Sequence, residues 1–147
     1  MYTLRSFNNP GAMEDYLNGA VISNPLAPVT FGLDGLTLII TASGSKTVTF
    51  SDASGAGLTP RQILDQILAV SGLGSAAVLR DYGYGAPSVC LAFTTIGHVV
   101  TKDGTANAIF GFSTSAGQTV AEVTTTNIVA MNVQVLAPLY SVLIHTS

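Results

Sequence analysis

Residues 59–71 read TPRQILDQILAVS and carry a complete set of helix signals. Thr59 can cap the helix with its hydroxyl, Pro60 fits the first helical position, and Gln62 stands at the spacing of a capping box. The apolar residues of the stretch recur at helical spacing: Ile63, Leu64, Ile67 and Leu68. Gly72 then tolerates the backbone conformation that ends a helix. The pattern predicts an amphipathic helix that must bury one face on other elements.

The rest of the chain favours strands. Two runs rich in Thr, Val and Ile, at 36–41 and 46–51, are separated by ASGS and predict a hairpin. Further strands are expected within 75–101, on both sides of the turn-rich DYGYGAPS, and within 117–147. The predicted fold class is α+β, with a mostly antiparallel β-sheet, the amphipathic helix at 59–71 packed on one face, and extended termini.

Two other segments carry weaker helix signals. One of the two asparagines before Pro10 can cap a short helix at 10–18, and Asp103 or Thr105 can cap a single turn at 104–110. Ile109, Phe110 and Phe112 of the IFGF sequence that ends the second segment are expected to anchor it in the core.

Charge is scarce along the whole chain. Charged residues make up 9% of the sequence, with five Lys and Arg and eight Asp and Glu, against about 25% in an average soluble domain. Because interface cores are depleted in charge, this composition favours a component of an assembly. The alternative is a Ser- and Thr-rich surface that tolerates few charges. A net charge of −3 without a basic cluster argues against direct binding of nucleic acid.

No apolar run is long enough to cross a bilayer, and the first residues lack the basic and apolar pattern of a signal peptide. We therefore expect no contact with membranes. The single cysteine, Cys90, excludes an intramolecular disulfide and fits a reducing compartment.

The chain divides, on this reading, into an N-terminal arm at 1–30 and a single α+β domain at 31–147. Pro25 and Pro28 favour an extended arm. The arm either lies along a neighbouring subunit, with Val21, Ile22 and Leu26 exposed, or packs across its own sheet. Apolar and aromatic residues of the arm, of the DYGYG loop and of the last strand are the predicted assembly contacts: Val21, Ile22, Leu26, Tyr82, Tyr84, Leu139, Tyr140, Val142 and Ile144.

Residues suited to catalysis or metal binding do not fall into working patterns. Cys90 stands between Val89 and Leu91 in a predicted strand, where a buried structural thiol is expected, and His98 is expected in a turn. Several aspartates lie near predicted turns, which turn formation explains more simply than paired catalytic carboxylates: Asp34, Asp52, Asp81 and Asp103. We therefore predict no catalytic residues, no metal site and no cofactor, and expect that the chain is not an enzyme.

The order of elements from Gly32 to Phe112 resembles a module of tailed-bacteriophage virion proteins. Its pieces are GLDGLTLII, KTVTF, LTPRQILDQI, the strands SAAVLRDYG and SVCLAFTT, and the ending TANAIFGF. A related pattern occurs in flagellar hook-associated proteins, and SFNNPGAMEDYLNGA is similar to the start of phage capsid-associated proteins. The chain departs from the pattern at Phe110, where a leucine before Gly-Phe is more usual.

The resemblance implies a structural virion protein, specifically a capsid cement (decoration) protein that stabilises a phage head in many copies. It implies two partners, the major capsid protein and other copies of this chain. It also implies a location on the capsid surface after assembly in the host cytoplasm. The alternatives are a tail or head–tail joining component, and a receptor- or glycan-binding module that uses the DYGYG loop.

Overall fold

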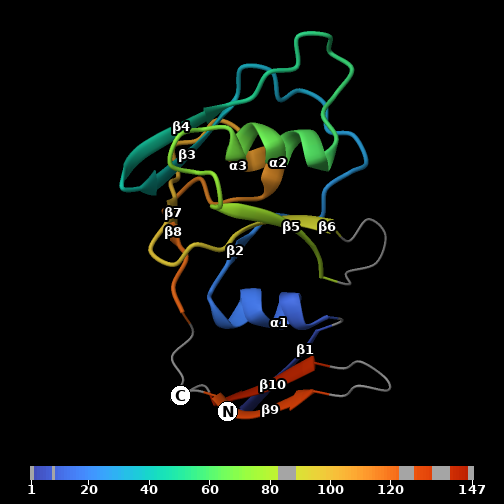
Figure 1. The fold of residues 1–147 in the computed structure, drawn as a ribbon, viewed down its shortest axis with the longest axis vertical. Coiled ribbons are helices and arrows are strands. Elements are labelled where there is room, and N and C mark those ends of the chain that lie inside the picture. Colours follow the sequence, from blue (N-terminus) through green and yellow to red (C-terminus); the bar gives the residue numbers. More distant parts are fainter. Residues whose placement is uncertain (1, 8, 83–88, 123–127, 134–139, 146–147) are drawn as a thin grey trace.

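The computed structural model describes the backbone of residues 2–7, 9–82, 89–122, 128–133 and 140–145, with side chains for 9–82 and 89–122. Within these residues it contains three antiparallel sheets and three helices, which confirms the predicted α+β class (Figure 1). One sheet has the order β4-β3-β7-β8, the next β2-β6-β5, and the last β1-β10-β9.

The helices are α1 (Pro10–Leu17), α2 (Pro60–Leu68) and α3 (Asn107–Phe110). The strands are β1 (Tyr2–Phe7), β2 (Val21–Ile22), β3 (Thr37–Ala42), β4 (Gly44–Thr49), β5 (Ala77–Asp81), β6 (Val89–Phe93), β7 (Val99–Val100), β8 (Gln118–Thr119), β9 (Ile128–Val133) and β10 (Tyr140–His145).

Helix α2 begins as its sequence predicts. The Gln62 N–H donates to the Thr59 hydroxyl at 3.2 Å, and the Thr59 N–H donates to the Gln62 side chain at 2.9 Å, which completes the capping box. Ile63 and Ile67 are fully buried. The helix ends at Leu68, earlier than predicted, because Ala69 forms its C-terminal cap and the positive-φ Gly72 belongs to the turn that follows.

The predicted hairpin is present as β3 and β4, with a tighter connection than expected: Ala42 pairs directly with Gly44 across Ser43. Gly44 has φ 101°, a value that a residue with a side chain rarely adopts. Helix α2 contacts β4. Just beyond the end of that strand, the Gln66 amide accepts from the Ser51 N–H at 2.8 Å and donates to the Ser51 carbonyl at 2.9 Å. A helix side chain thus satisfies backbone groups beside a sheet edge.

The two short helices form where predicted, but only one has a predicted cap. The Asn9 side chain accepts from the Ala12 N–H at 2.7 Å and caps α1. Helix α3 starts after Ala106, which has no capping side chain, so the expectation of an Asp103 or Thr105 cap was wrong. The Thr105 hydroxyl does not cap the helix, since it accepts a hydrogen bond from the Thr37 N–H at 2.8 Å at the start of β3.

The main core lies between the sheets β4-β3-β7-β8 and β2-β6-β5 and helix α2. Aromatic rings from separate segments meet there, with Phe50 and Phe110 5.7 Å apart and Phe93 and Phe112 5.8 Å apart between ring centroids. The expectation that Ile109, Phe110 and Phe112 anchor the core is confirmed for the two phenylalanines. It was wrong for Ile109, whose side chain lies on the solvent side of α3.

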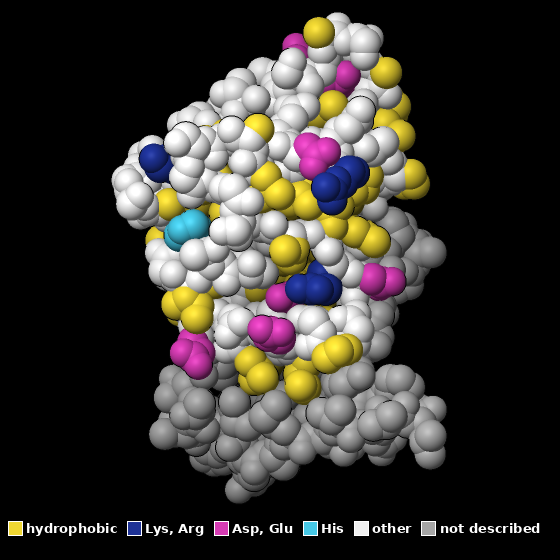
Figure 2. All heavy atoms as spheres, in the orientation of Figure 1, with side chains coloured by type: hydrophobic (Ala, Val, Ile, Leu, Met, Phe, Trp, Pro, Cys, Tyr) yellow, Lys and Arg dark blue, Asp and Glu magenta, His cyan; other side chains and the backbone are white. Residues whose placement is uncertain are grey.

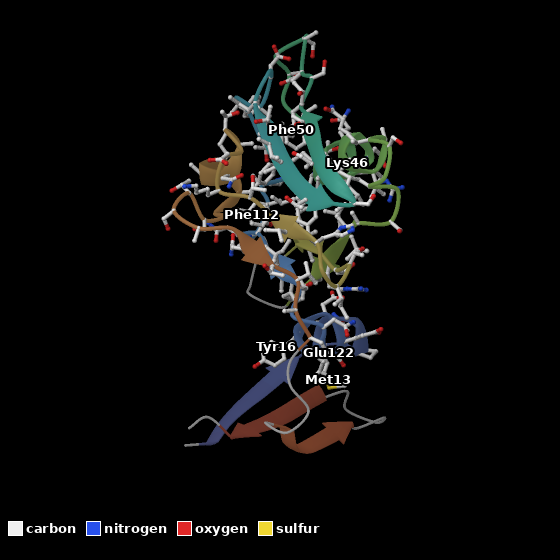
Figure 3. All side chains as sticks on the ribbon, turned by 90° about the vertical axis from the view of Figure 1, so that its left-hand side faces the viewer. Met13, Tyr16, Lys46, Phe50, Phe112 and Glu122 are labelled. Carbon is white, nitrogen blue, oxygen red and sulfur yellow. The ribbon has the colours of Figure 1, made fainter. Side chains whose placement is uncertain are left out.

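The sheet β2-β6-β5 buries both of its faces. Along β6, Leu91 and Phe93 belong to the main core, while Cys90 and Ala92 belong to a second, smaller cluster that includes Ala12 of α1. Helix α1 in turn contacts β1 and β10 of the sheet β1-β10-β9. It therefore lies between two sheets, as Figure 1 shows, and Met13 lies on the side facing the sheet β1-β10-β9 (Figure 3).

Residues 1–30 pair with the rest of the chain. Strand β1 pairs with β10 from Tyr2↔His145 to Phe7↔Tyr140, and β2 pairs with β6. The segment after β2 continues along β6, where the Leu26 N–H donates to the Val89 carbonyl at 2.8 Å. Of the two arrangements considered for the two-proline segment, the structure has the one in which it packs across its own sheet.

Candidate functional site

A buried ionic cluster joins α1 to strand β5. The Asp15 carboxylate accepts a hydrogen bond from Arg80 Nε at 2.8 Å and a longer one from Arg80 Nη2 at 3.3 Å. It also accepts from the Tyr82 hydroxyl at 2.7 Å. Asp15 is 4% exposed and is the one charged residue that is fully buried in the described part of the chain. The carboxylate is thus surrounded by donors from a strand far away in sequence.

The electrostatics of this cluster keep both of its donors protonated. Burial, the hydrogen bond to Asp15 and the negative charge of that carboxylate raise the pKa of the Tyr82 phenol well above its ordinary value. The hydrogen bond to Asp15 is also the main cause that raises the pKa of Arg80. Neither group is prepared to release a proton near neutral pH. The arrangement therefore connects α1 to β5 through two protonated donors and one carboxylate acceptor.

No local sequence pattern indicates this cluster. Asp15 stands in a weakly amphipathic helix, and Arg80 and Tyr82 lie 65 and 67 residues further along the chain. One indirect sign is the alternation of Val78, Arg80 and Tyr82 along one face of a strand, which is typical of residues sharing an environment.

Of the predicted assembly contacts in the arm, Val21 and Leu26 are each only 6% exposed and belong to the main core. The expectation that they are exposed was wrong, because backbone pairing with β6 places both side chains inside. Ile22 is partly buried against the second cluster. Tyr82 is 8% exposed and bonded to Asp15, so it does not offer a contact surface.

Other predicted contacts lie where no side chain is described. Tyr84 and Leu139 fall outside the described residues, and Tyr140, Val142 and Ile144 belong to β10, of which the backbone is described. That backbone is the central strand of its sheet, with β1 on one side and β9 on the other. Strand β10 therefore has no open edge for pairing with another chain.

Cys90 has the properties of a structural thiol. It is fully buried, and desolvation raises the pKa of its thiol, which disfavours the reactive thiolate. His98 lies in the turn before β7, where its backbone N–H donates to Thr95 and its carbonyl accepts from Val120. Among the residues with described side chains, no three His, Cys, Asp or Glu groups gather as a metal site requires.

Asp34 and Asp52 organise a loop. Asp34 accepts from the Asp52 N–H at 2.8 Å, and Asp52 accepts from the Gly57 N–H at 3.0 Å. Both carboxylates are thus used for backbone hydrogen bonds, as turn-forming aspartates are.

The exposed surface is poor in charge and carries isolated large apolar groups. Figure 2 shows one face, on which charged side chains are scattered among wide uncharged areas. Among the side chains of 9–82 and 89–122, the large apolar groups left exposed are Phe31 at 64%, Ile96 at 54% and Ile109 at 42%. Asp15, one of the eight acidic residues, is withdrawn from this surface altogether.

Comparison with protein-family models, with curated proteins and with solved structures gave no significant match. In the described part of the chain, no helix has the length and apolar character needed to cross a bilayer.

Proposed function

We propose that this chain is a structural protein of a tailed-bacteriophage particle, specifically a capsid cement protein that binds the major capsid protein and neighbouring copies of itself. The observation that carries the proposal is the charge-poor surface with exposed Phe31, Ile96 and Ile109. Water-exposed apolar area of this kind is stabilised when a partner covers it, by about 25 cal/mol per Å². The choice of a phage capsid as the partner depends on the sequence resemblance of Gly32–Phe112.

The chemistry of the described residues supports a binding role. The carboxylates of Asp15, Asp34 and Asp52 accept hydrogen bonds within the fold, and Cys90 is buried. Contacts through small patches are weak individually, but a repeated lattice of them is strong because each bound copy adds its neighbours' contacts. A cement protein works in this way.

The test is to measure binding to particles. Purified chain is added to particles that lack it, the particles are sedimented, and bound protein is quantified against the major capsid protein. Bound chain that reaches a constant ratio to the capsid protein, together with a higher temperature of genome release, supports the cement role. Enrichment limited to one ring per particle supports the head–tail or tail component. Binding to host cells or glycans in place of particles overturns the proposal in favour of a recognition module.

A further inference from the structure

Helix α1 is attached to the body of the protein by a small apolar interface. The buried side chains of this interface are Ala12, Tyr82, Cys90 and Ala92, with Ala20, Ile22 and Val78 partly buried beside them. Most of these side chains are small, and they form a cluster separate from the main core with its phenylalanines and leucines. Since hydrophobic stabilisation scales with the apolar area removed from water, these described side chains hold α1 to the sheet β2-β6-β5 more weakly than the main core holds α2, while α1 also contacts β1 and β10.

Polar contacts supply the rest of the attachment. Besides the bonds from Arg80 and Tyr82 to Asp15, the Asn9 side chain donates to the Asp81 carbonyl at 2.9 Å. The backbone of α1 at Gly11 also lies close to the Arg80 side chain, since a Cβ on Gly11 would lie 2.6 Å from Arg80 Nη1. The Asp15 side chain is 6% exposed and the Arg80 side chain 33% exposed, so the loss of Arg80 would leave the buried carboxylate without its charge partner.

Directly after α1, the chain runs beside a segment that is distant in sequence. Gly19, with φ 69°, stands just after the helix, and a Cβ there would overlap the carbonyl oxygen of Ala121. The segment that follows α1 and the segment that follows β8 therefore run side by side. Because α1 also contacts β1 and β10, a movement of α1 away from the sheet β2-β6-β5 carries those two strands with it, and this junction is one place about which it can turn.

We infer that α1, together with the strands β1 and β10 that it contacts, is a releasable cover, closed by the Asp15–Arg80–Tyr82 cluster, which opens from the sheet β2-β6-β5 while the main core stays folded. Opening of this kind needs less free energy than global unfolding, because only the small cluster is exposed. It uncovers Cys90, which is fully buried beneath α1 in the closed form. The single cysteine of the chain is thus a built-in reporter of the opening.

The experiment measures the labelling rate of Cys90 by a thiol reagent in the native full-length protein, scaled to the rate in the urea-unfolded protein. Global stability is measured in parallel by urea unfolding. We expect Cys90 to react through an opening that is more frequent than global unfolding and nearly independent of low urea concentrations. Hydrogen exchange should show that amides of α1 lose protection at the same frequency, while those of α2 do not.

Substitutions distinguish opening of α1 from unfolding of the main core. Asp15→Asn should accelerate labelling by about tenfold or more, since it removes the charge that pairs with Arg80. Tyr82→Phe, which removes only a hydroxyl, should act in the same direction and serves if Asp15→Asn does not fold. Glu14→Gln, an exposed neighbour on the same helix, should leave the rate unchanged. Ile67→Ala should lower global stability without changing the labelling rate.

Two results would overturn the inference. The first is wild-type labelling that occurs only at the frequency of global unfolding. The second is acceleration by Ile67→Ala as large as its loss of global stability predicts, because Cys90 would then be reached only through an unfolded core. Faster labelling of Cys90 in Asp15→Asn or Tyr82→Phe, while the α1 amides stay protected, would also contradict the proposed opening.

Discussion

The hydroxyl of Tyr82 donates a 2.7 Å hydrogen bond to the carboxylate of Asp15, across 67 positions of sequence. The bond places a buried negative charge under α1 and a neutral phenol beside it. Because the ionised phenol would face that carboxylate without water, the pKa of Tyr82 is raised. The stability of the α1 attachment is therefore linked to pH at the alkaline end.

Tyr82→Phe should lower the free energy of unfolding at neutral pH by about 1.5–3 kcal/mol, the usual contribution of a hydrogen bond to a charged group. The wild-type contribution is complete below the unfolded pKa of about 10 and is lost as the pH rises beyond it, because the unfolded chain then releases the proton first. The difference between the two proteins should shrink above pH ~10. Urea melts across this range measure it, and a difference that stays constant would contradict the linkage.

Thr59→Ala should destabilise the protein by about 1 kcal/mol, because it removes the hydroxyl that accepts from the Gln62 N–H. Thr59→Ser retains the acceptor and is the matched control. Thermal or urea unfolding of the pair decides the point, and equal losses in both variants would mean that the cap is not the cause.

Ile67→Ala should cost about 2–5 kcal/mol, because Ile67 is fully buried and the variant leaves a cavity in the main core. Urea unfolding with an unchanged m-value would attribute the loss to native-state packing. A midpoint equal to that of the wild type would show that burial of the apolar face of α2 does not stabilise the protein.

Local patterns predicted α2 and its cap, the β3–β4 hairpin and the α+β class, because the signals of each lie within a few residues. The position of Leu26 could not be predicted in the same way. Proline spacing indicates extended backbone, but it says nothing about which strand will pair with that backbone. The burial of Leu26 depends on the hydrogen bond from its own N–H to Val89, which is distant in sequence.

The same limit applies to the buried cluster. A carboxylate at Asp15 reads as a solvated helix residue until the fold brings Arg80 to it. Sequence reasoning identified the aromatic Tyr82 as a contact residue, but it could not distinguish an outward contact from an inward one. The strand register decided this, by placing Tyr82 on the face that α1 covers.

Gly104→Ala should destabilise the fold, while Gly74→Ala should be tolerated. A Cβ at Gly104 would collide with the Asn107 side chain and lie 2.9 Å from the Thr37 carbonyl, whereas nothing stands within 4 Å of a Cβ at Gly74. Asn107 cannot easily move, because its amide donates to the carbonyls of Thr101 and Ser113 at 2.7 and 2.8 Å. Melting temperatures of the two variants test this, and a stable Gly104→Ala protein would show that the loop adjusts.

Deletion of residues 1–28 should prevent stable folding, because it removes Val21 and Leu26 from the main core. A shorter deletion of residues 1–8 removes β1 and should leave the β3–β8 region folded. Circular dichroism and hydrogen exchange of α2 amides compare the two. A cooperative unfolding transition in the longer deletion would show that β2 and the segment after it are dispensable, as a free arm would be.

Phe31→Ser should weaken binding to particles while leaving the free energy of unfolding nearly unchanged. Phe31 is 64% exposed, so its ring adds little to the core, but under the proposed function it is available to a partner. Ile96→Ser and Ile109→Ser, at 54% and 42% exposure, map whether the contact extends to other parts of the surface.

The matched control is Thr47→Ser, an exposed position on β4 where little apolar area changes. Sedimentation with particles lacking the chain measures retention. Full retention of all three variants would mean that the charge-poor surface, not its apolar groups, makes the contact, or that the chain does not bind particles through the described residues.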